Sequence, residues 1–171
     1  RFNSFLEKWK EIGLSYVAVG FESFSDYELE YLNKKTSAEI NEKAIKIIAR
    51  NNIVLYANFI VRPDFTREDF QRLKGYVRKK KLYNPKFPIY TPFPGTDYYE
   101  SVKPKVMSDD YELYDFKHAL TPTKLPIKEF YQEYINLQKY TVPRMRAYID
   151  LIKRPLAGII PLILKRRKSL S

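Results

Sequence analysis

The spacing of apolar residues alternates along the first 92 positions between a helical and a strand-like pattern. Four segments repeat apolar residues every three to four positions, which is the period of an amphipathic helix. Most of these segments open on Ser or Thr with Glu three positions later, a pair that caps helix N-termini. We predict helices over residues 4–12, 25–33, 36–51 and 66–81.

Three shorter runs are rich in β-branched and aromatic residues, as buried strands are. They cover residues 15–20, 53–61 and 86–91, and Pro92 stops the last of them. Successive runs begin roughly 35 residues apart with a helix between them, which is the spacing of βαβ units in a parallel sheet. The pattern predicts an α/β fold, and a half-barrel and a doubly wound sheet both fit it.

Ligands of parallel sheets bind at the carboxyl ends of the strands. In this sequence those ends fall at residues 20–26, 61–64 and 91–96. We therefore expect any functional site to be built from these three loops.

Beyond Pro104 the sequence is rich in Tyr and Pro and shows no further strand pattern. Helical spacing predicts a helix over 126–140 and continues, interrupted by prolines, over 143–168. We predict two parts, an α/β domain over 1–104 and a helical C-terminal extension with a basic tail over 105–171.

Most of the net charge of +11 belongs to that tail. Residues 141–171 hold eight Lys or Arg and one Asp, so they carry +7, and the rest of the chain is mildly basic. The apolar run 155–164 followed by the basic cluster 165–168 suits contact with an anionic membrane surface, although it is too short to span a bilayer. The alternative is a terminal helix packed on the domain. We expect a cytoplasmic protein, membrane-peripheral if 155–168 binds lipid.

The chain contains no cysteine and one histidine, His118. Disulfides and thiolate metal sites are therefore excluded for this chain, and one histidine cannot build a histidine metal site by itself. We assign neither metal ligands nor catalytic residues to this chain. The absence of cysteine fits a reducing compartment.

Four short motifs lie at or near the predicted strand ends: GFESFSD at 20–26, LNK at 32–34, NFIV at 58–61 and TPFPGT at 91–96. In this order and spacing they resemble the fourth, fifth and sixth strand ends of the radical S-adenosylmethionine (SAM) (β/α)6 partial barrel. The resemblance covers about residues 1–120 and implies the C-terminal half of that barrel, with about three parallel strands. It points in particular to the class with a cobalamin-binding domain, which includes the anaerobic magnesium-protoporphyrin IX monomethyl ester oxidative cyclase.

The resemblance implies a radical SAM iron–sulfur oxidoreductase or transferase with a small-molecule substrate. In this family three cysteines bind a [4Fe–4S] cluster, and electron transfer from the cluster cleaves SAM to a 5′-deoxyadenosyl radical. Cobalamin is a further cofactor of the class. Since this chain has no cysteine to bind such a cluster, we expect a fragment that is inactive alone, with the cluster ligands upstream of Arg1 in the parent protein.

The resemblance also implies four residues that bind SAM. Glu22 would accept hydrogen bonds from the ribose hydroxyls, with Asn58 as a polar neighbour. Lys34 would neutralise the methionyl carboxylate as a point charge, and Phe93 would line the adenine pocket.

Simpler roles remain open for each of these residues. Glu22 can cap a helix or pair with a nearby lysine, and Lys34 can form a solvated pair with Lys35. Asn58 can bond to backbone, and Phe93 can belong to a proline turn that closes a strand.

Two positions depart from the family pattern. Phe24 stands where a small residue is usual, and Arg62-Pro63 replaces a Gly-x-Pro sequence after the fifth strand. Both departures are expected to place bulk or charge near the path of the cofactor. They support an alternative function, a non-catalytic scaffold derived from the barrel.

A nucleic-acid-binding module is another alternative, suggested by the positive charge and the many aromatic residues. The basic residues gather in the tail and the aromatic ones fall at core-like positions, which argues against nucleic acid. Separately, a half-barrel would expose unpaired sheet edges, and such edges pair with other chains. We therefore predict that the chain self-associates.

Overall fold

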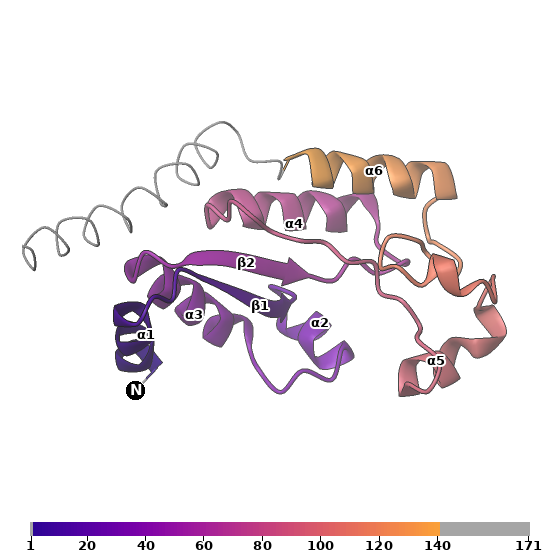
Figure 1. Ribbon diagram of the computed structural model, residues 1–171. Coiled ribbons are helices and arrows are strands. Elements are labelled where there is room, and N and C mark those ends of the chain that lie inside the picture. The colour runs from indigo at the N-terminus through magenta and orange to yellow at the C-terminus, as the bar shows by residue number, and fades with distance from the viewer. Residues whose placement is uncertain (1, 141–171) are drawn as a thin grey trace, which may run out of the picture. The chain divides into compact units, whose positions relative to one another are not determined.

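Residues 2–140 are described in the computed structural model of the chain (Figure 1). They form helices, two strands and two short 3₁₀ helices. In chain order these are α1 (Phe2–Glu11), β1 (Tyr16–Glu22), α2 (Asp26–Tyr31), α3 (Ala38–Arg50), β2 (Val54–Phe59), α4 (Arg67–Lys79), α5 (Asp97–Val102), η1 (Lys103–Lys105), η2 (Tyr111–Leu113) and α6 (Ile127–Tyr140).

The predicted α/β class is confirmed for these residues. Strands β1 and β2 pair in parallel, with Tyr16 opposite Val54 and Gly20 opposite Asn58. Helix α3 connects the two strands and packs against β2. The helices predicted from apolar spacing within this part of the chain are present, with ends shifted by a few residues.

The third predicted strand, 86–91, is not a regular strand. Two isolated parallel bridges join it to the chain at and after β2. The amides of Lys86 and Tyr90 each donate to a carbonyl of the 57–61 segment at 2.8 Å. Pro88 stands midway between them and has no amide proton to donate. The missing donor interrupts the ladder, so the segment runs beside β2 without forming a continuous strand.

Helix capping follows the sequence signals in part. Thr66 and Asp69 form the reciprocal capping box of α4. At α2 the expected box between Ser25 and Glu28 is absent: the Ser25 side chain makes no cap, and the Ser23 hydroxyl donates to Glu28 instead.

The start of α3 is also capped differently from the pattern in the sequence. Ser37 is its N-cap, and the Ser37 hydroxyl accepts from the Ile40 amide at 3.2 Å. The Asp26 carboxylate accepts from the Ala38 amide at 2.7 Å. Asp26 therefore caps the helix after α2, a role in capping rather than in chemistry.

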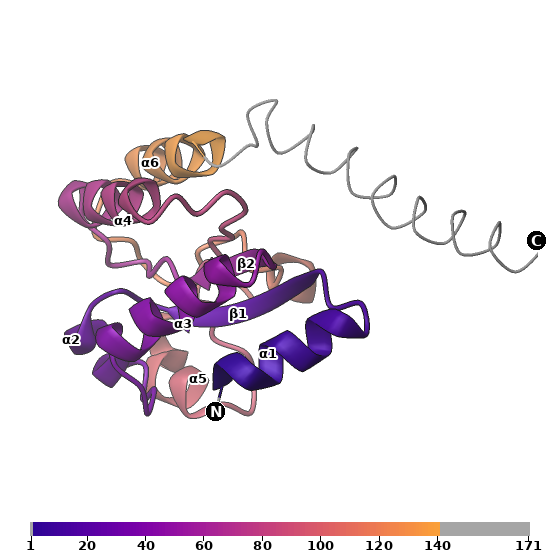
Figure 2. The ribbon, with the colours of Figure 1, turned by 90° about the vertical axis from the view of Figure 1, so that its left-hand side faces the viewer.

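The main core lies between the strands, α4 and α6. Helices α4 and α6 lie side by side in both views (Figures 1 and 2). The rings of Phe70 and Phe130 meet edge to face with centroids 5.5 Å apart, and Arg67 pairs with Glu129 at 2.7 Å. Other fully buried members are Phe21, Phe59, Val61, Leu73, Val77, Phe87, Ile89 and Leu137. The first helix of the predicted extension is therefore part of this core.

Helix α1 contributes much less to the interior. Leu6 packs with Ile48 and Ile53 in a small second cluster. The side chains of Phe5 and Trp9 are half exposed, at 51% and 47%. In both views α1 lies below the strands, whereas α4 and α6 lie above them (Figures 1 and 2).

The predictions for the basic tail, including the helical spacing over 143–168 and membrane contact through 155–168, lie outside the described residues. Within 2–140, none of the helices combines the length and the apolar character that crossing a membrane requires.

Candidate functional site

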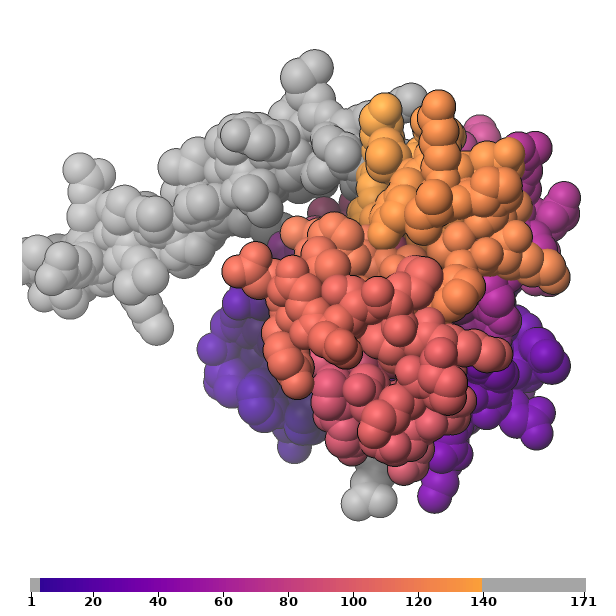
Figure 3. All heavy atoms as spheres, turned by 90° about the vertical axis from the view of Figure 1, so that its right-hand side faces the viewer, coloured from indigo at the N-terminus to yellow at the C-terminus, as the bar shows by residue number. Residues whose placement is uncertain are grey.

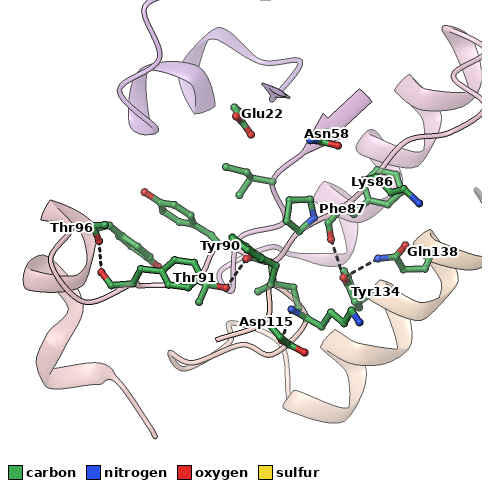
Figure 4. A pocket seen from close by; sticks show the side chains of 17 residues that line it. Glu22, Asn58, Lys86, Phe87, Tyr90, Thr91, Thr96, Asp115, Tyr134 and Gln138 are labelled. Carbon is green, nitrogen blue, oxygen red and sulfur yellow. Dashed lines mark hydrogen bonds between the residues drawn. The ribbon is translucent and has the colours of Figure 1, made fainter. Parts of the chain in front are cut away.

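A cavity of about 1000 Å³ opens where the strands end. Glu22, Asn58 and Phe93, predicted from three different strand ends, all line it. Figure 4 shows Glu22 and Asn58 at one side and Asp115 at the other. The segment from α5 through η2, together with α6, covers this face of the molecule (Figure 3). The structure thus brings three of the four predicted SAM-binding residues together.

Glu22 ends β1 in an unusual conformation. Its φ is 63°, in the left-handed region that costs a non-glycine residue roughly 1–2 kcal/mol. The register of the sheet shifts between Gly20 and Glu22. A Cβ at Gly20 would lie 2.5 Å from the Glu22 Oε1 atom. The glycine therefore leaves the space that the carboxylate occupies.

Asn41 of α3 holds this strained loop in place. Its side chain is 7% exposed and its Nδ2 atom donates to the carbonyls of Phe21 and Ser23, at 3.1 Å each. The carbonyl of Glu22, between them, accepts from the Ile60 amide at 2.9 Å. Three consecutive carbonyls are thus fixed, which stabilises the left-handed backbone at Glu22. Sequence signals do not indicate Asn41, because nothing local links it to a loop about 20 residues earlier.

Lys34 does not line the cavity, but it contacts a residue that does. Its Nζ atom lies 3.0 Å from Glu22 Oε1, and the two side chains are 44% and 16% exposed. Glu22 therefore pairs with a nearby lysine, one of the simpler contacts expected for it. The pair also places a cation beside the carboxylate that faces the cavity.

Asn58 and Phe93 reach the cavity from the next two loops. Asn58 pairs with Gly20 in the sheet, so its side chain lies close to the end of β1. Phe93 stands between two prolines, and its ring centroid is 5.0 Å from that of Phe116. Gly95 completes the turn with a φ of 85°, which suits glycine. The proline turn therefore presents an aromatic surface to the cavity.

Several curated proteins are similar to most of this chain. No protein-family model matches the chain. Hopanoid C-3 methylase of Methylococcus capsulatus is 30% identical over 132 residues, 77% of this chain and 25% of that protein. Bacteriochlorophyllide d C-12(1)-methyltransferase of Chlorobaculum tepidum is 29% identical over 130 residues, 74% of this chain and 28% of that protein. Anaerobic magnesium-protoporphyrin IX monomethyl ester cyclase of Rubrivivax gelatinosus is 31% identical over 129 residues, which are 74% of this chain and 22% of that protein.

The chain belongs to the radical SAM superfamily. The cyclase is the relative that the strand-end motifs indicated, so the resemblance seen in the sequence is confirmed. The chain spans about a quarter of the length of these curated relatives.

The radical SAM chain places its two departures from the family pattern away from the cavity lining. Phe24 stacks on Tyr76 of α4, with centroids 4.8 Å apart, and packs against the main core. The core takes up the Phe24 ring, which does not line the cavity. The Arg62 side chain is largely buried, and its guanidinium carbon lies 4.3 Å from the centroid of the Tyr31 ring.

Two stacked tyrosines form one wall of the cavity. The ring centroids of Tyr90 and Tyr98 are 3.8 Å apart. Burial raises the pKa of Tyr98 to about 12, although a hydrogen bond with Thr121 opposes it. Burial also raises the pKa of Tyr90. Both phenols are therefore neutral hydrogen-bond donors at physiological pH. Sequence signals do not indicate this pair, because the two rings meet only in the folded turn between them.

No group of three metal-ligating side chains comes together in residues 2–140. His118 Nδ1 lies 3.0 Å from Asp115 Oδ1 at the surface. With no thiolate in the whole sequence, the residues of this chain do not fit an iron–sulfur cluster.

Proposed function

We propose that this chain is the C-terminal half of a radical SAM barrel and forms one wall of its SAM site. One observation carries the proposal: Glu22, Asn58 and Phe93, from three successive strand ends, line a single cavity of about 1000 Å³. That volume suits a ligand of the size of SAM.

Each lining residue offers chemistry that one part of SAM requires. The Glu22 carboxylate can accept hydrogen bonds from both ribose hydroxyls, and charge-assisted bonds of this kind are strong. The Asn58 amide lies on the neighbouring strand. Phe93 offers an apolar ring for the flat adenine base.

The ion pair with Lys34 supports a role for both partners. Lys34 is half exposed and tethered to Glu22 at one atom, Oε1. Since a lysine ammonium is a flexible point charge, Lys34 can pass from Glu22 to the methionyl carboxylate when SAM binds. Glu22 then has both carboxylate oxygens available for the ribose.

The rest of the barrel would add to β1. Within the described residues β1 pairs on one side alone, with β2. Its residues Tyr16, Ala18 and Gly20 are exposed, as are Phe5 and Trp9 of the neighbouring helix α1. Further parallel strands at this edge would cover both surfaces. The relatives are about four times as long as the matched region, which leaves room for such strands.

The cluster and the radical chemistry would lie outside this chain. Bound SAM supplies the reactive 5′-carbon, and the residues described here would hold its ribose, base and carboxylate. We expect no SAM cleavage by this chain alone. The parent would act on a small-molecule substrate, and cobalamin would be bound by another part of it.

The test is a binding measurement on the 171-residue chain by isothermal calorimetry. The ligand is S-adenosylhomocysteine, which keeps the ribose, the base and the carboxylate of SAM. We expect Glu22→Gln to weaken binding about tenfold or more, because it removes a charged acceptor. Glu39→Gln, which changes the same charge on the exposed surface of α3, is the matched control.

A second ligand isolates the ribose. Wild-type chain should prefer adenosine to 2′-deoxyadenosine, and Glu22→Gln should lose that preference. If S-adenosylhomocysteine does not bind, or binds wild type and Glu22→Gln equally, the SAM site is refuted and the scaffold function becomes the better hypothesis.

A further inference from the structure

Phe116 lines the cavity, yet none of the motifs at the strand ends contains it. It follows Asp115, which lies across the cavity from Glu22 and Asn58 (Figure 4). It belongs to the predicted C-terminal extension, well beyond the last motif at 91–96. The extension therefore supplies part of the cavity wall, and the resemblance to the family assigns no role to this part.

The backbone at Phe116 is strained and firmly held. Its φ is 63°, in the left-handed region that bulky residues rarely adopt. The Phe116 carbonyl accepts from the Ile89 amide at 2.7 Å. The Asp115 carboxylate accepts from the amides of Lys117 and His118, at 2.8 and 3.1 Å. Strain that the surrounding bonds maintain in this way is common where a protein holds a ligand.

The Phe116 ring is not buried in return for this strain. It is 51% exposed, and its centroid lies 5.0 Å from that of Phe93, with the two ring planes 54° apart. Contact with Phe93 covers only part of the ring, and the rest faces the cavity and solvent. Packing in the core therefore does not explain why a phenylalanine occupies this position.

Two rings at this angle form a corner that suits a flat aromatic group. Aromatic groups attract one another face to edge as well as face to face, so a base in the corner can lay its face on one ring and turn an edge toward the other. Bases stack on aromatic side chains through their faces, whatever polar groups their edges carry. Since neither phenylalanine has a hydrogen-bonding side chain, the corner recognises flat area rather than a pattern of donors and acceptors.

We infer that Phe116 completes the adenine pocket and packs, together with Phe93, on the base of SAM. This inference rests on the proposed function and deepens it: Glu22 holds the ribose, and the two phenylalanines hold the base. A corner that recognises area should favour a two-ring purine over a one-ring pyrimidine. Glu22 does not contribute to that choice, because adenosine and uridine carry the same ribose.

The experiment measures by isothermal calorimetry how tightly variants of the 171-residue chain bind S-adenosylhomocysteine. We expect Phe116→Ala to weaken binding about fivefold or more, because the base loses one of its stacking surfaces. Phe116→Tyr keeps the ring and should recover most of the lost affinity. Phe5→Ala is the matched control, since Phe5 is also 51% exposed but lies on α1 and does not line the cavity.

A pair of nucleosides isolates the base. Wild-type chain should bind adenosine about fivefold or more tightly than uridine, and Phe116→Ala should narrow this ratio. Should Phe116→Ala fail to fold, Phe116→Gly makes the same test, because glycine adopts the left-handed conformation without strain.

The outcomes separate this inference from the proposed function. Binding of S-adenosylhomocysteine that weakens in Glu22→Gln but is equal in wild type and the Phe116 variant without a ring overturns the inference and leaves the SAM site standing. Equal affinity of wild-type chain for adenosine and uridine also overturns it. If wild-type chain does not bind S-adenosylhomocysteine at all, the SAM site itself is refuted, and the adenine pocket with it.

Discussion

Two amphipathic helices on opposite sides of the strands differ in how their apolar faces are used. On α6 the ring of Phe130 is fully buried against Phe70 of α4. On α1 the rings of Phe5 and Trp9, 5.3 Å apart, remain half exposed. Both helices show apolar residues at helical spacing in the sequence.

The difference shows that an apolar stripe predicts a helix without identifying its partner. Helix α6 finds its partner within the described residues, and α1 buries little beyond Leu6. An apolar surface left in water is a common mark of an interface. The α1 side is therefore where we expect further structure to pack.

The largest loss of stability is expected where α6 packs on α4. Phe130→Ala removes a fully buried ring and should lower the free energy of unfolding by about 3–5 kcal/mol. Trp9→Ala removes a larger ring that is half exposed, and we expect it to cost less than half as much. Urea denaturation followed by circular dichroism measures both. Similar losses for the two variants would contradict the contrast between the helices.

A smaller effect is expected at Asn41 of α3. Asn41→Ala removes the side-chain donor to the Ser23 carbonyl and one of two donors to the Phe21 carbonyl. We expect a loss of about 1–3 kcal/mol in unfolding free energy. Binding of S-adenosylhomocysteine should weaken as well, because the loop that aims Glu22 loosens. Unchanged stability and affinity would show that Asn41 does not support this loop.

The smallest change in stability is expected on β1, which within the described residues pairs on one side alone. Ala18 is exposed in the middle of β1, so Ala18→Lys should alter the free energy of unfolding by less than about 0.5 kcal/mol. A lysine on an edge strand blocks pairing with another chain. We expect multi-angle light scattering to report an oligomer for wild type and a monomer for the variant. A monomeric wild type would disprove the predicted self-association.

Much of this fold follows from local signals in the sequence. The apolar period marked the helices, and the run at 53–61 marked β2. Three motifs at strand ends pointed to Glu22, Asn58 and Phe93, which do share one cavity. These successes rest on interactions within a few residues or on the topology of parallel strands.

The misses involve contacts between distant segments. The pairing of 86–91 with β2 depends on where Pro88 falls in the ladder, which requires the register to be known. Tertiary packing also produces three other contacts. They are the bonds from Asn41 to the loop after β1, the bond that Glu28 accepts from Ser23 rather than pairing with Ser25, and the stacking of Tyr90 on Tyr98. Capping patterns could not reveal them, because several acceptors compete for each donor.

The close approach of Gly20 and Glu22 has a consequence for how the family can vary. The carboxylate of Glu22 fills the space where any side chain at Gly20 would begin. The two positions are therefore epistatic: a larger residue at position 20 becomes tolerable after position 22 has lost its long side chain, and a glutamate can return after position 20 has reverted to glycine. A path that enlarges position 20 first requires the Glu22 side chain to move, whereas a path that shortens position 22 first leaves position 20 free to change.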